Sequence, residues 1–81
     1  TTLSQKTVKS RLALSLIQLN EIYSGTITLS REDLANFIGT ATENLIRTLK
    51  MFKTEKLIHV DGKKIELLDI QKLNEIGKDL L

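Results

Sequence analysis

Cysteine is absent from this chain of 81 residues, and aromatic side chains are scarce. Without cysteine the chain can form no disulfide, carries no thiol nucleophile and offers no cysteine-ligated zinc site. With only two phenylalanines and one tyrosine, the hydrophobic core has to be built mainly from leucine and isoleucine. Hydrophobic residues make up 41% and charged residues 27%, so we expect residues 1–81 to form one ordinary globular domain.

Long apolar runs are missing as well. No stretch approaches the ~20 residues that a membrane-spanning helix requires, and the first residues do not follow the signal-peptide pattern. We therefore expect a cytoplasmic protein without membrane contact. The sequence also lacks a glycine-rich phosphate loop, a catalytic triad pattern and a metal-ligand cluster, so we expect no enzyme. The single histidine, His59, has no partner at ligand spacing and is interpreted as a strand side chain.

Charge is distributed unevenly, although the net charge is only +2. Residues 42–64 carry six basic and three acidic side chains, whereas residues 65–81 carry two basic and four acidic ones. A contiguous positive stretch is expected of a surface that faces nucleic-acid phosphates. A solvated helix face has the same appearance, so charge alone leaves both interpretations open.

The first element predicted from hydrophobic periodicity is an amphipathic helix over residues 6–23, with Ser4 as its N-cap. Leu14 falls nearly opposite the apolar stripe, so we expect it to be exposed or to contact a further domain. The stripe itself consists of Val8, Leu12, Leu16, Leu19 and Tyr23.

A short second helix is predicted to follow a breaker pair at residues 24–25 and a small β-prone segment at residues 26–28. Ser30 is the expected N-cap, and Asp33 favours the positive end of the helix dipole. Gly39 would end the helix in a tight turn that needs a positive φ. The apolar side is expected to comprise Leu34, Phe37 and Ile38.

A longer helix is predicted over residues 42–55, with two contrasting sides. One side carries Leu45, Leu49 and Phe52, and the other carries Glu43, Arg47, Lys50 and Thr54.

Asp61-Gly62, which joins two β-prone runs at residues 57–60 and 63–68, is a strong hairpin signal. Asp69 is then expected to cap a last amphipathic helix that carries Ile70, Leu73, Ile76 and Leu80.

This order of elements is that of a winged helix-turn-helix, a mainly α fold with a small β-hairpin. Within the motif, the small side chain of Ala35 would let the two helices cross closely, and Leu45 would close the core between them. Thr48 stands where an apolar residue is commoner, so we expect looser packing there.

Residues 29–50 resemble the helix-turn-helix of the cyclic-AMP receptor protein and FNR family of transcription regulators. Leu57-Ile58, Asp61-Gly62-Lys63 and Ile65 are similar to the wing of that family, and residues 11–19 are similar to the first helix of its DNA-binding domain. The resemblance implies sequence-specific binding of double-stranded DNA, with residues 42–55 in the major groove and residues 57–68 on the backbone.

The family's base-reading Glu and Arg match Glu43 and Arg47 by position. Arginine can bond the O6 and N7 atoms of guanine together, and glutamate can accept from cytosine N4. Thr42 occupies a position that carries an additional base-reading arginine in some members, and a threonine cannot make that bidentate contact.

The family's phosphate-contacting residues match Ser30 and Arg31 at the start of the short helix and Lys63 in the wing. A capping hydroxyl, free amides and a cation at a helix N-terminus suit a phosphate. Lys50, on the outward side of the longer helix, is also placed with the backbone contacts.

The same residues also allow simpler interpretations. Glu43 and Arg47 are four residues apart and can form a surface ion pair, and Lys63 can be an ordinary solvated turn residue. Ile46 can touch a thymine methyl group or flank the core. The alternative function is a winged-helix protein–protein interaction module, although an outward side rich in charge disfavours it.

For the whole regulator, the resemblance implies a homodimer with an N-terminal effector-sensing domain, so the chain is expected to be a fragment that is monomeric by itself. An effector such as a cyclic nucleotide would bind that sensing domain, and we expect no cofactor in this one. Residues 23–26 resemble the region that some activators of the family present to RNA polymerase.

Overall fold

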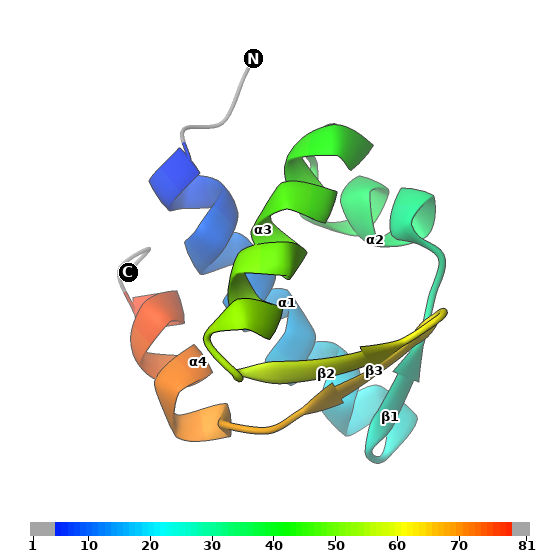
Figure 1. The fold of residues 1–81 in the computed structure, drawn as a ribbon, viewed down its shortest axis with the longest axis vertical. Helices are drawn as coiled ribbons and strands as arrows, with labels where there is room; N and C mark the ends of the chain where they lie inside the picture. Colours follow the sequence, from blue (N-terminus) through cyan, green and yellow to red (C-terminus); the bar gives the residue numbers. More distant parts are fainter. Residues whose placement is uncertain (1–4, 79–81) are drawn as a thin grey trace.

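Four helices and a small sheet follow one another in the predicted order within residues 5–78, the part of the chain that the computed structural model describes (Figure 1). The predicted N-cap Ser4 and the predicted apolar residue Leu80 lie outside the described residues. The elements are α1 (Gln5–Tyr23), β1 (Thr26–Thr28), α2 (Arg31–Ile38), α3 (Thr42–Thr54), β2 (Ile58–Asp61), β3 (Lys64–Leu67) and α4 (Ile70–Lys78).

The core is built almost entirely from aliphatic side chains, as the scarcity of aromatics required. In α1, the predicted stripe is buried from Val8 to Leu19, but Tyr23 at its end is 38% exposed. All four helices and all three strands contribute to the buried cluster, in which Phe52 is the largest side chain. None of the helices within residues 5–78 is long and apolar enough to cross a membrane.

Leu14 was expected to be exposed or to contact a further domain, but it faces α4 of this domain. It is half-buried, and α1 and α4 lie side by side in Figure 1. A Cβ atom at Gly77 would lie 2.6 Å from Leu14 Cδ2, closer than real carbon atoms approach. The absence of a side chain at Gly77 therefore leaves the space that the Leu14 side chain occupies. As predicted, Asp69 caps α4, since its Oδ1 accepts from the Lys72 amide at 3.0 Å.

The turn between α2 and α3 has the predicted local chemistry. Ser30 Oγ accepts from the Asp33 amide at 3.1 Å, and Gly39 adopts a φ of +89° while donating its N–H to the Ala35 carbonyl at 2.8 Å. Ala35 is buried where the helices meet. Phe37, expected on the apolar side of α2, is instead 50% exposed.

Thr48 is fully buried in α3 despite its hydroxyl group. Its Oγ1 donates to the Asn44 carbonyl at 2.9 Å, so the polar atom is satisfied within the helix itself. The methyl group is then left for the core, which explains how a threonine occupies an apolar position.

The sheet has three antiparallel strands in the order β1-β3-β2, so the hairpin gains a third strand from the segment after α1. Asp61 pairs with Lys64, which makes Gly62-Lys63 the two-residue turn. The predicted turn, Asp61-Gly62, was therefore one residue too early. Gly62 has a φ of +61° and Lys63 has no positive φ, the pattern of a type II′ turn.

Candidate nucleic-acid interface

Helix α3 has one side in the core and one side in solvent, as its sequence predicted. Leu45, Leu49 and Phe52 are buried. The outward side of α3 consists of Glu43, Arg47 and Lys50, and all three are exposed. These three charged residues are spaced four and three apart, which aligns them along the helix. The helix therefore presents a charged ridge, and Ile46 beside it is 50% exposed.

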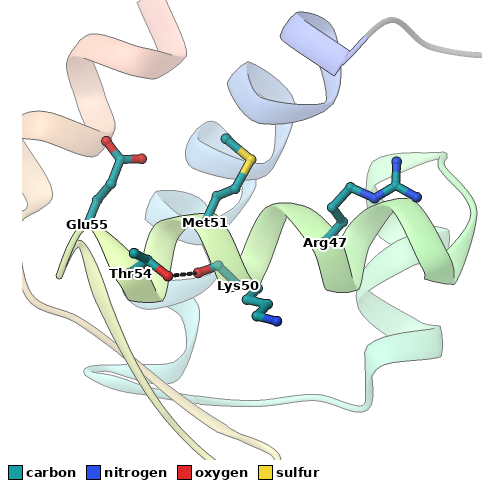
Figure 2. A pocket seen from close by; sticks show the side chains of 5 residues that line it. All are labelled: Arg47, Lys50, Met51, Thr54 and Glu55. Atoms are coloured by element: carbon teal, nitrogen blue, oxygen red, sulfur yellow. Dashed lines mark hydrogen bonds between the residues drawn. The ribbon is translucent and has the colours of Figure 1, made fainter.

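Arg47 and Glu43 do not form the surface ion pair that their spacing allows: within residues 5–78 no salt bridge joins the two side chains. Figure 2 shows the Arg47 guanidinium extended away from the other labelled side chains. A hollow of about 450 Å³ runs along this part of α3, and its lining residues are Arg47, Lys50, Met51, Thr54 and Glu55. Arg47 is thus unpaired at the end of an open surface.

Thr42 is the first residue of α3 and is half-buried. Ala41 occupies the N-cap position and makes no side-chain capping bond. The first amides of α3 are therefore uncapped by the preceding residue, and Glu43 is the acidic side chain of the first turn.

We define the wing as β2, the Gly62-Lys63 turn and β3. Hydrogen bonds join the tip of the wing to the start of α2. Arg31 Nη2 donates to the Gly62 carbonyl at 2.8 Å. The Leu29 amide donates to the Lys63 carbonyl at 3.3 Å. These bonds bring the predicted phosphate contacts Ser30, Arg31 and Lys63 together, although they are about thirty residues apart in sequence. Figure 1 shows the hairpin tip beside the segment that leads into α2.

Arg31 therefore has a structural role that sequence reasoning missed. One guanidinium nitrogen holds the wing turn, and the other, Nη1, is buried without a partner. No sequence pattern could reveal this bond, because it depends on how the wing folds back toward α2.

A second hollow, the groove between α3 and β2, has a volume of about 240 Å³. Its lining residues are Arg31, Ile46, Leu49, Lys50, Lys53 and Val60. The predicted residues Arg31 and Lys50 meet here, and Lys53 joins them without having been predicted as a contact. The sequence feature that could have indicated Lys53 is its position three residues after Lys50 in the positively charged stretch of residues 42–64.

No group of three or more His, Asp or Glu side chains within the described part of the chain is arranged to hold a metal ion. His59 is an exposed strand residue opposite Glu66 of β3. The interpretation of His59 as a strand side chain is confirmed.

A family model for the Crp-like helix-turn-helix domain matches residues 10–76. The chain belongs to this family. The match spans α2, α3 and the wing together, so the resemblance seen in the sequence is confirmed over most of the chain. The protein is thus a DNA-binding domain of the Crp/Fnr type of transcription regulator, and this family is not one of enzymes.

Known regulators are similar to the Crp-like domain over most of its length. Transcriptional activator protein FnrA of Stutzerimonas stutzeri is 31% identical over 75 residues, which cover 83% of this chain and 31% of that protein. Fumarate and nitrate reduction regulatory protein of Vibrio cholerae is 30% identical over 93% of this chain and 33% of its own length. The chain therefore spans about a third of the length of these relatives.

Solved structures share the fold. The crystal structure of the Thermus thermophilus catabolite activator protein superposes with a TM-score of 0.86 over 95% of this chain and 37% of that chain, at 23% identity. The winged helix-turn-helix arrangement is therefore that of the family.

Proposed function

We propose that the Crp-like domain binds double-stranded DNA sequence-specifically, with α3 in the major groove and the wing on the backbone. The observation that carries this proposal is the outward side of α3, where Glu43, Arg47 and Lys50 are exposed while the opposite side is buried. The major groove is about 12 Å wide and admits an α-helix. A helix with a charged outer side and a fixed inner side suits that insertion.

Base reading is assigned to Arg47, Glu43 and Thr42. Arg47 is unpaired and extended, so its guanidinium can bond O6 and N7 of one guanine. Glu43 can accept a hydrogen bond from cytosine N4. Thr42 offers one hydroxyl group, which supports a single hydrogen bond and no bidentate contact.

Backbone contacts are assigned to Ser30, Arg31, Lys50 and Lys63. The Ser30 hydroxyl already accepts a capping bond, and its own hydrogen remains available to a phosphate oxygen. Lys50 and Lys63 are exposed, so they can approach phosphates at little desolvation cost. Arg31 contributes the positive charge of its guanidinium, which the bond to the Gly62 carbonyl holds beside the wing turn.

For the complete regulator we propose a cytoplasmic homodimer that carries an effector-sensing domain before this one, with the isolated domain monomeric. Two copies would then read a near-palindromic site. The segment from Tyr23 to Thr26 is proposed to face RNA polymerase. Its central residues Ser24 and Gly25 are exposed and adopt positive φ angles, which gives the loop a defined shape.

The test is to measure how Arg47→Ala changes discrimination between DNA sequences. Duplexes selected from a randomised pool provide the preferred site, and two copies of the domain joined by a flexible linker provide measurable affinity. Arg47→Ala should lose about 1–3 kcal/mol of binding free energy on the preferred site and much less on random DNA. Equal losses on both would make Arg47 a phosphate contact.

Arg11→Ala is the matched control, because it removes one exposed arginine from α1 and leaves α3 unchanged. It should preserve the ratio of affinities for the preferred and random duplexes. Failure of the unmodified protein to bind any duplex would refute the proposed function as a whole.

A further inference from the structure

The groove between α3 and β2 carries more positive charge than the hollow that Arg47 lines. Three of its six lining side chains are cationic, and none is acidic. Arg31 comes from α2, and Lys50 and Lys53 come from α3. Cations on two elements therefore surround one site, and no carboxylate of the lining neutralises them.

Arg31 also has an unused hydrogen-bond donor. Nη2 is held at 2.8 Å by the Gly62 carbonyl, while Nη1 is shielded from solvent and has no partner. A buried guanidinium nitrogen without an acceptor is costly, since its desolvation is not repaid. Arg31 also lines the groove, so an anionic oxygen seated there would offset the charge of this guanidinium.

The other three lining residues of the groove, Ile46, Leu49 and Val60, are apolar. Ile46 is 50% exposed, so this edge of α3 meets solvent and is open to a ligand. A free inorganic anion gains nothing from these apolar side chains, whereas the carbon face of a deoxyribose can pack on them. The combination of cationic and apolar lining residues favours a sugar–phosphate unit.

We infer that this groove seats one phosphate of the DNA backbone, with its sugar against Ile46 and Val60, and that Lys53 is a contact residue for it. This inference rests on the proposed function and adds Lys53 to the residues that contact the DNA backbone. Arg31 links this phosphate to the Gly62 carbonyl, so one side chain couples the position of the wing to the seated strand.

The experiment measures how the affinity for random duplex DNA depends on salt, because phosphate contacts act on every sequence. In Lys53→Ala, the slope of log K against log salt should become shallower by about 0.9, the contribution of one neutralised phosphate. Lys53→Arg keeps the charge and should keep the slope. Lys72→Ala, an exposed lysine of α4, removes the same charge elsewhere and should leave the slope unchanged.

An unchanged slope in Lys53→Ala, with normal duplex binding, would overturn the subsite and leave the proposed function standing. Equal changes in Lys53→Ala and Lys72→Ala would also overturn it, because the effect would then be one of net charge. Inorganic phosphate at constant ionic strength should not displace the duplex, and strong competition would mean a site for free anions. No binding of duplex by the unmodified chain would overturn both proposals.

Discussion

Thr42 begins α3 beside the two charged residues that we assign to base reading, and it is the shortest side chain of the three. Its hydroxyl can make one hydrogen bond, so the base pair next to it is expected to be read weakly. Glu43 and Arg47, in contrast, each have a chemical group that matches a particular base edge. The specificity of the domain should therefore be concentrated at the base pairs that these two residues reach.

Thr42→Arg should add a guanine preference at a neighbouring base pair. A new bidentate contact is worth about 1–3 kcal/mol of discrimination, which exceeds the roughly 0.3–1 kcal/mol that a cation at a helix N-terminus costs. Titration against a panel of duplexes with single-base substitutions measures the change. A uniform gain on every duplex would contradict base reading by the introduced arginine.

At the scale of elements, helix caps and turns with purely local causes were predictable from the sequence. The side chains of Ser30 and Asp69 bond amides three residues ahead, and Gly39 supplies a positive φ, so neighbouring residues alone determine them. The alternation that identifies a strand is local too. These features sufficed to predict the order of the elements.

Features that depend on distant partners were missed. The Asp61-Gly62 signal predicts a hairpin but not its register, which places Ile65 opposite Val60 on one side and opposite Ile27 on the other. Ile65 and Ile27 are both fully buried, and a slip by one residue would turn Ile65 to the other face. The partner Ile27 is 38 positions away in sequence, so a local pattern contains no information about it.

For the candidate site, spacing placed Glu43, Arg47 and Lys50 on one exposed side, and the structure confirms that placement. Which of them touch bases and which touch phosphates stays a prediction, because that depends on the DNA. The bond from Arg31 to Gly62 and the position of Lys53 in the groove required the folded chain, since both depend on the wing packing beside α2 and α3.

The contact between α1 and α4 gives a prediction for stability. Gly77→Ala should lower the free energy of unfolding by about 1–3 kcal/mol, because the new methyl group overlaps the Leu14 side chain. Combining it with Leu14→Ala should remove the overlap, so the double variant should lose less than the sum of the single losses. Urea unfolding measures all three variants.

Asn74→Ala is the control for this comparison. It places alanine at an exposed position of the same helix, where higher helix propensity is the main effect, and should not destabilise the domain. Strictly additive losses for Leu14→Ala and Gly77→Ala would contradict the direct contact between the two positions.

At the scale of the whole molecule, the proposed DNA-binding residues come from three elements that lie together. Arg31 begins α2, Arg47 and Lys50 lie on α3, and Lys63 lies in the wing turn that Arg31 holds. Helix α4 packs on α1, away from the wing tip in Figure 1. The proposed DNA-binding residues thus lie together, away from α4.

We propose above all that DNA contacts α3, the start of α2 and the wing. Backbone amide chemical shifts of the labelled domain, recorded by NMR while a short duplex is added, test it most directly. The largest changes should occur at residues 42–50, at Arg31 and at Gly62 and Lys63, with α4 nearly unaffected. Changes concentrated in α1 and α4, with residues 42–50 unaltered, would contradict this DNA-binding surface.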